Sequence, residues 1–105
     1  MRFKVFRTKT FEKEFEKLPK KEQQEICEFE IKLSENPFLG KPLGLVFFRE
    51  KKLKSRRVYY LVYEDYIIVL MVTISDKKAQ QATIDAIKEK LDEYHEMIKE
   101  TLKNI

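Results

Sequence analysis

Six cationic side chains lie close together in one short segment of the chain, which reads REKKLKSRR. They are Arg49, Lys51, Lys52, Lys54, Arg56 and Arg57, and with the single acid Glu50 they give the segment a net charge of +5. The whole chain of 105 residues has a net charge of only +4, so its positive charge is concentrated here. Because a β-branched and aromatic run follows at once, the pattern indicates an anion site on a β-sheet, and nucleic acid is the commonest large anion.

Cations arranged in this way could cleave RNA, which carries its own nucleophile in the 2′-OH. The reaction needs a group that accepts the 2′-OH proton and donors for the charge that develops on the phosphate. We expect Arg57 to hold phosphate oxygens, because a planar guanidinium matches them better than an ammonium does. The surrounding charges favour the neutral, proton-accepting form of Lys51, so we expect Lys51 to act as the base and Lys77 to support the leaving group.

The residue inventory argues against other kinds of site. The single histidine, the single cysteine and the isolated acid pair Glu64-Asp65 form no metal-ligand set, so we expect no metal and no cofactor. Cys27 falls in a helical pattern, where we expect a buried, inert thiol. The N-terminus lacks the apolar core of a signal peptide and no apolar run is long enough to span a bilayer, which predicts a cytoplasmic protein without membrane contact.

Hydrophobic periodicity predicts the element order β-α-α-β-β-β-α. We expect strands at 3–5, 45–48, 58–63 and 66–74, and helices at 8–18, at 20–35 and from 76 to the C-terminus. The breaker Asn36-Pro37 ends the second helix, and Gly40, Pro42 and Gly44 indicate a loop. The fold class is therefore α+β: a mainly antiparallel four-stranded sheet with an N-terminal helical hairpin and a long C-terminal helix, in a single domain over residues 1–105.

Strand alternation assigns side chains to the two faces of this sheet. Val58 and Tyr60 are predicted to pack on the helices, so Arg57 and Tyr59 point to a second face that we expect to be open to solvent. The RNA-binding residues expected on or beside this open face are Lys52, Lys54, Arg56, Lys78 and Tyr59. Tyr59 could stack on a base, although aromatic residues in strands more often pack in the core. A solvated edge strand protected by its charges is the alternative explanation of the cations.

The end of the last helix extends the domain over residues 93–105. Ile98, Leu102 and Ile105 continue its apolar stripe. A helix from 76 to 104 would be about 43 Å long, longer than a domain of this size is wide. We therefore expect the extension either to fold along the first two helices or to pair with a second copy as a homodimer. Truncation after Glu96 should lower stability or change the oligomeric state and leave the site competent.

Several pieces of the chain follow one another in a characteristic order. They are a helical hairpin ending in Asn36-Pro37, a basic strand, the sequence RVYY from Arg57, a hydrophobic strand, and DKKAQQ from Asp76 at the start of the last helix. This order resembles the RelE/ParE superfamily of small toxins, most closely the variant described as addiction-module killer proteins. The resemblance covers about residues 1–92.

The resemblance implies the toxin of a type II toxin-antitoxin system, a ribosome-dependent messenger-RNA endonuclease held inactive by a small antitoxin protein. It places the two arginines of the family on Arg57 and Lys77. The basic residues of the family's second strand fall on Arg49 and Lys51, or in the other register on Lys52 and Lys54. The tyrosine that several nucleases of the family carry early in the last helix corresponds to Thr83, which is a departure from the pattern.

Two other functions remain open at this point. The ParE-like branch of the superfamily inhibits DNA gyrase without cleaving nucleic acid, so a protein-binding poison is the first alternative. An inactive RNA-binding descendant is the second, since Thr83 and Lys77 both depart from the family's nuclease pattern. A neighbouring reading frame for an antitoxin would favour either toxin over the inactive descendant.

Overall fold

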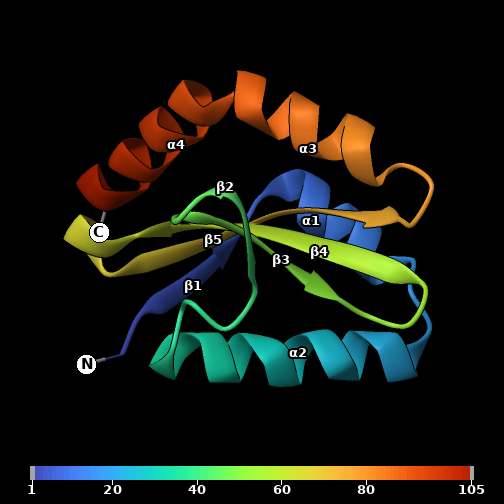
Figure 1. Ribbon diagram of the computed structural model, residues 1–105. Coiled ribbons are helices and arrows are strands. Elements are labelled where there is room, and N and C mark those ends of the chain that lie inside the picture. The colour runs from blue at the N-terminus through green and yellow to red at the C-terminus, as the bar shows by residue number, and fades with distance from the viewer. Residues whose placement is uncertain (1, 105) are drawn as a thin grey trace.

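The computed structural model describes residues 2–104, which form one five-stranded sheet with helices on both faces (Figure 1). The strands are β1 (Lys4–Arg7), β2 (Lys41–Leu45), β3 (Phe48–Lys52), β4 (Arg56–Tyr63) and β5 (Ile68–Asp76), in the sheet order β1-β5-β4-β3-β2. The helices are α1 (Lys9–Glu16), α2 (Lys20–Glu35), α3 (Gln80–Glu89) and α4 (Leu91–Lys103), and a 3-10 turn, η1 (Glu64–Tyr66), follows β4. Within this described part β1 and β5 are parallel and the other pairs antiparallel, so the predicted α+β class is confirmed.

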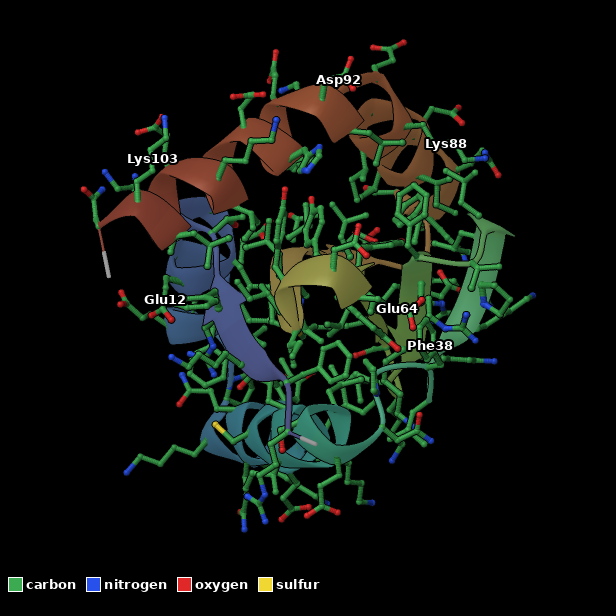
Figure 2. The ribbon with its side chains drawn as sticks, turned by 90° about the vertical axis from the view of Figure 1, so that its left-hand side faces the viewer. Glu12, Phe38, Glu64, Lys88, Asp92 and Lys103 are labelled. Carbon is green, nitrogen blue, oxygen red and sulfur yellow. The ribbon has the colours of Figure 1, made fainter. Side chains whose placement is uncertain are left out.

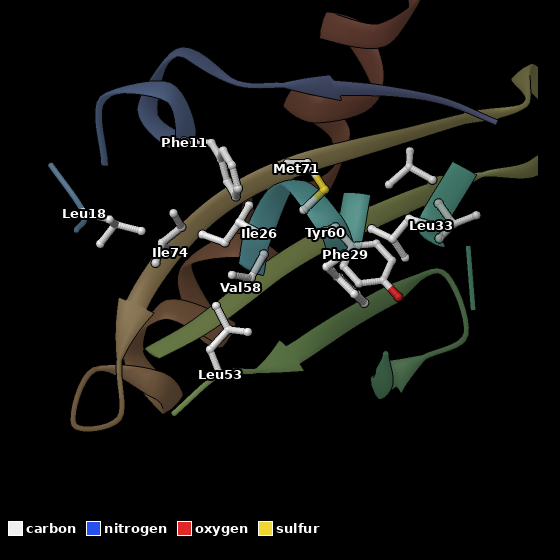
Figure 3. Packing of buried hydrophobic residues seen from close by; sticks show 12 residues of the cluster. Phe11, Leu18, Ile26, Phe29, Leu33, Leu53, Val58, Tyr60, Met71 and Ile74 are labelled. Carbon is white, nitrogen blue, oxygen red and sulfur yellow. The ribbon is translucent and has the colours of Figure 1, made fainter. Parts of the chain in front are cut away.

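Both faces of the sheet are covered, which corrects the prediction of an open face. α2 lies beneath the sheet, and α3 and α4 arch over the opposite face (Figure 1). Val58 and Tyr60 pack on the α2 side, as predicted, beside Ile26 of α2 (Figure 3). The alternate β4 residues Tyr59 and Leu61 are fully buried as well, in a second cluster with α3 and α4. Strands that are apolar on both sides are typical of a sheet that has helices packed on both faces.

The segment predicted as a loop forms the edge strand β2, so the sheet has five strands rather than four. Pro42 lies opposite Arg49 on this edge, where no further strand needs the N–H that proline lacks. Gly44 adopts a left-handed conformation with φ 86° at the irregularity between Pro42 and Leu45, which glycine does without strain. The chain returns as β3 from Phe48, so the strand predicted at 45–48 is wrong in its bounds.

α1 closes the part of β5 that extends beyond its pairing with β1. The Thr8 hydroxyl caps the helix by accepting from the Phe11 N–H at 3.0 Å, and it donates to the carbonyl of Val72 at 2.7 Å. The Glu14 carboxylate accepts from the backbone N–H of Ile74 at 2.9 Å. Side chains of one helix therefore satisfy the strand edge that β1 leaves free.

Cys27 is exposed on α2, so the prediction of a buried thiol is wrong. The buried residues of this helix are Ile26, Phe29 and Leu33. Each helical residue is rotated about 100° from the one before it, so the residue next to Ile26 falls outside the buried stripe.

The predicted single C-terminal helix is two helices, α3 and α4, which meet at Lys90. The bend lets Ile84, Ile87 and Ile98 all pack on one face of the sheet. A straight helix of about 43 Å would exceed the longest dimension of the molecule, 35 Å. The extension therefore packs on its own domain, on the sheet face opposite α2 rather than along the first two helices. No second copy is needed to bury Ile98, and Ile105 lies outside the described residues.

Replacing Ile98 by alanine should destabilise the domain strongly. Its side chain is 1% exposed in the cluster between α4 and the sheet. Removing a fully buried isoleucine costs about 2 to 5 kcal/mol, because a cavity remains. Met97 is 43% exposed one position earlier, so Met97→Ala is the matched control and should change the free energy of unfolding by less than about 0.5 kcal/mol. Urea denaturation measures both, and equal effects would show that α4 does not pack as described.

Candidate nucleic-acid interface

One end of the sheet carries a polar cluster on the face that α3 covers. Lys52 lies opposite Arg57, Arg57 lies opposite Ser75, and Glu50 lies opposite Tyr59. Opposed residues of antiparallel strands point to the same face, so these side chains share one side of the sheet. The strand-end cluster, as we name it here, consists of Glu50, Lys52, Arg57, Tyr59 and Ser75 with Gln80 of α3.

Arg57 is the buried cation of the strand-end cluster. It is 5% exposed, so the prediction that its side chain faces open solvent is wrong. Its Nη1 donates to the carbonyl oxygen of Arg56 at 3.2 Å. Within residues 2–104 its guanidinium forms no ion pair with a carboxylate. A buried guanidinium without a carboxylate partner keeps donors for an external anion.

Glu50 belongs to the same cluster, although no pattern in the sequence points to it. It is 6% exposed, and both of its carboxylate oxygens accept from Nε2 of Gln80 at 3.0 Å. Gln80 begins α3, thirty positions further along the chain, so no local spacing indicates this contact. The DKKAQQ motif that contains Gln80 was the one available signal. The contact fixes the orientation of a carboxylate on the same face of the sheet as Arg57 and Lys52.

Tyr59 belongs to the strand-end cluster but lies in the hydrophobic core. It is fully buried, its hydroxyl lies 2.9 Å from the Ser75 hydroxyl, and Ser75 donates to the carbonyl of Asp76 at 2.9 Å. Burial raises the pKa of Tyr59, and the hydrogen bond with Ser75 opposes that shift. No base can reach a ring in this position, so the prediction that Tyr59 stacks on bases is wrong.

Four exposed lysines surround this end of the sheet. Lys52 ends β3 and Lys54 lies in the turn to β4, while Lys77 and Lys78 lie in the turn from β5 to α3. The two turns adjoin because the first residue of β4 pairs with the last residue of β5. We name these lysines the lysine rim, and they provide positive charge around Arg57.

The remaining cations of the basic segment point to the α2 side of the sheet. Arg49 donates to the backbone carbonyls of Gly40 at 2.9 Å, Val46 at 2.8 Å and Phe38 at 3.1 Å. A guanidinium that is bonded to three carbonyls holds the β2–β3 region in place and has little capacity left for a phosphate. Arg49 therefore lies outside the strand-end cluster, on the opposite face of the sheet from its neighbour Glu50.

Lys51 and Arg56 also lie away from Arg57. The Lys51 ammonium lies 5.5 Å from the centre of the Phe29 ring, in a hollow that Glu28 of α2 also lines. Arg56 forms an ion pair with Glu22 of α2 at 2.9 Å. In the register that the sequence left as the second choice, Lys52 lies opposite Arg57 and Lys54 lies in the turn that follows. Both lysines also line the hollow around Lys51.

Thr83, the departure from the family pattern, lines a different hollow. This hollow has a volume of about 790 Å³ and lies between α3, α4 and the start of α1, where Thr8, Thr10 and Ala86 also line it. Gln80 rather than Thr83 is the α3 residue that reaches the strand-end cluster.

Solved structures with a similar fold include RelE toxins, alone and in RelBE complexes. A mutant of E. coli toxin RelE in the free state is 20% identical, with a TM-score of 0.72 over 85% of this chain and 98% of that chain. A RelBE toxin-antitoxin complex from Mycobacterium tuberculosis is 23% identical, with a TM-score of 0.64 over 73% of this chain and 100% of that chain. The archaeal RelE-RelB complex from Pyrococcus horikoshii OT3 is 21% identical, with a TM-score of 0.65 over 73% and 97%.

The chain therefore has the RelE fold, as the resemblance implied. No protein-family model matches the sequence, and no curated protein matches it significantly. Among residues 2–104 there is no group of three or more histidine, cysteine or acidic side chains that could hold a metal ion. None of the helices described above is both long and apolar enough to cross a membrane.

Proposed function

We propose that this chain is the toxin of a toxin-antitoxin pair and that it cleaves messenger RNA on the ribosome. The observation that carries the proposal is the strand-end cluster, in which Arg57 is buried and has no carboxylate partner among residues 2–104, and an oriented Glu50 lies on the same face of the sheet. The lysine rim supports the proposal, because its positive charges lie around this end of the sheet and attract phosphates. The RelE fold supports the toxin role, since the similar structures are RelE toxins, alone or with RelB antitoxins.

The chemistry proposed is attack of the RNA's own 2′-oxygen on the adjacent phosphorus. Glu50 accepts the 2′-OH proton in place of Lys51, the 2′-oxygen bonds to phosphorus, and the bond from phosphorus to the 5′-oxygen breaks. Arg57 holds the non-bridging oxygens as their charge grows. The leaving 5′-oxygen takes a proton from a rim ammonium, Lys52 or Lys77. The products are a 2′,3′-cyclic phosphate and a 5′-hydroxyl.

The proposal includes a small antitoxin as partner and the cytoplasm as location. The similar structures from Mycobacterium tuberculosis and Pyrococcus horikoshii OT3 contain an antitoxin bound to the toxin, which supports a partner of that kind here. A ribosomal substrate requires the cytoplasm. Expression of the chain should stop growth, and co-expression of the short neighbouring reading frame should restore it.

Reconstituted translation of one defined message tests the activity itself. With the purified chain we expect cleavage at discrete positions, mapped by primer extension, only when ribosomes are translating the message. Gyrase supercoiling assays with the same preparation should remain unchanged. Inhibited supercoiling with an intact message would instead identify a gyrase poison, and RNA binding without either effect would identify an inactive RNA-binding protein.

Binding to single-stranded RNA should depend steeply on salt. If the lysine rim contacts four phosphates at about −0.7 each, log affinity should fall against log salt with a slope of about −3. Lys52→Ala should make this slope shallower by about 0.7, because one contact is lost. Lys51→Ala is the matched control on the other face of the sheet and should leave the slope unchanged. Fluorescence anisotropy at several salt concentrations measures this, and a slope near zero for the parent would exclude a nucleic-acid interface.

A further inference from the structure

Another hollow lies at the opposite end of the sheet from the strand-end cluster. It forms where β4 passes through η1 into β5, beside the first residues of α4, and its volume is about 390 Å³. Its wall includes the rings of Tyr63, Tyr66 and His95 and the side chain of Leu91. Arg57 and Tyr63 are six residues apart in β4, which is about 20 Å in an extended strand, so the two sites are separate.

The three rings form a rigid wall. The Tyr63 ring stacks on His95, with centroids 5.7 Å apart, and on Tyr66 at 6.4 Å. The Tyr66 hydroxyl and Nε2 of His95 lie 3.2 Å apart, within hydrogen-bonding distance. The Tyr63 hydroxyl is buried and has no hydrogen-bond partner among residues 2–104. An unpaired buried hydroxyl is uncommon in a folded protein, and the Tyr63 hydroxyl can still take a hydrogen-bond partner.

Carboxylates line the same hollow. Glu64, Asp65 and Asp92 all contribute to it and are exposed. Within residues 2–104 none of the three forms an ion pair. Figure 2 labels Glu64, which lies in η1, and Asp92, which lies on the helix α4 above it. The residues that line the hollow include these three carboxylates and no lysine or arginine, so its charge is opposite to that of the basic segment.

Aromatic faces beside free carboxylates suit one class of ligand. A guanidinium stacks on aromatic rings through its flat face and donates in pairs to carboxylates through its edge. Phosphates are repelled by the same carboxylates, which disfavours nucleic acid. Phe47, in the adjoining turn between β2 and β3, is 39% exposed and also lines the hollow, so it offers apolar contact to residues beside the bound group.

We propose that this aromatic, acidic hollow binds an arginine side chain of a protein partner. The partner's guanidinium lies against the rings of Tyr63 and Tyr66 and pairs with Asp92, and its flanking residues contact Phe47. The proposal does not depend on RNA cleavage, because the hollow lies away from Arg57 and Glu50.

NMR of the aromatic and histidine side chains tests this with N-acetyl-arginine amide as the probe. We expect saturable shifts confined to Tyr63, Tyr66 and His95, and no such shifts with N-acetyl-citrulline amide, which has the same shape without the charge. Asp92→Asn should weaken the affinity about tenfold, because one charge-assisted hydrogen bond is lost. The matched control Asp85→Asn changes an exposed acid of α3 that pairs with Gln81 and should bind as the parent does.

Equal binding of the citrulline compound would overturn the assignment. Shifts located away from the hollow, or equal affinities of the Asp92→Asn and Asp85→Asn variants, would also overturn it. Shifts of the same three rings on addition of inorganic phosphate would show an anion site and contradict it as well. Message cleavage by Asp92→Asn should match the parent, so a failure of this site and a failure of the nuclease proposal give different results.

Discussion

Arg57→Ala is expected to lower the rate of message cleavage about 100-fold to 1000-fold, the loss seen when one donor to a developing oxyanion is removed. The guanidinium is buried in the strand-end cluster and forms no ion pair with a carboxylate of residues 2–104, so it keeps donors for a phosphate. Arg57→Lys keeps the charge but loses the planar pair of donors, and we expect it to recover only part of the rate. Single-turnover cleavage on programmed ribosomes measures these rates.

The neighbouring residue provides the control for this prediction. Arg56 carries the same side chain one position earlier, but it points to the other face of the sheet and pairs with Glu22. Arg56→Ala should therefore cleave within about threefold of the parent, since a half-exposed ion pair contributes little. Circular dichroism melting would establish that each variant is folded. If both alanine variants lost activity equally while folded, the assignment of the site to one face of the sheet would be wrong.

Glu50→Gln is expected to lower cleavage about 100-fold to 10,000-fold, the range for loss of a general base. The carbonyl oxygen of the new side chain can still accept from Gln80, so the local structure should persist. RNA affinity should rise rather than fall, because a negative charge is removed from a phosphate site. Slower chemistry with tighter binding is a combination that a purely structural role for Glu50 does not produce.

Glu28→Gln is the matched control for Glu50. Glu28 is an exposed carboxylate of α2 and lines the hollow around Lys51 together with Lys52 and Lys54. Its replacement should leave the cleavage rate unchanged, because Glu28 lies on α2 and outside the strand-end cluster. Retention of full activity by Glu50→Gln would exclude the carboxylate as the proton acceptor and would favour a rim lysine in that role.

The periodic parts of the fold could be predicted from the sequence. The α2 helix and its end at Asn36 follow from regular apolar spacing and a following proline, and the alternation in β4 places Val58 and Tyr60 correctly. The edge strand β2 could not be predicted this way, because Pro42 and Gly44 are typical of loops and are tolerated here only by the edge position and the bulge.

The site was harder to predict than the fold, for reasons of register and distance. Lys51 and Lys52 are adjacent in sequence, and only the pairing of β3 with β4 shows which of them shares a face with Arg57. In the sequence, Glu50 is a single acid among six cations and has no distinguishing feature. Its contact with Gln80 is present only in the folded chain. The burial of Arg57 depends on α3 and α4 covering a face that the sequence alone left open.

The most direct test of this account uses a message with a single 2′-deoxynucleotide on the 5′ side of a mapped cleavage position. The proposed chemistry requires that 2′-oxygen as the nucleophile, so the substituted position should resist cleavage while neighbouring sites on the same message are cut as before. The unmodified message should give a 2′,3′-cyclic phosphate and a 5′-hydroxyl at the cut. Cleavage of the deoxy-substituted message at an unchanged rate would contradict the account, because the attacking oxygen would then have to come from water or from the protein.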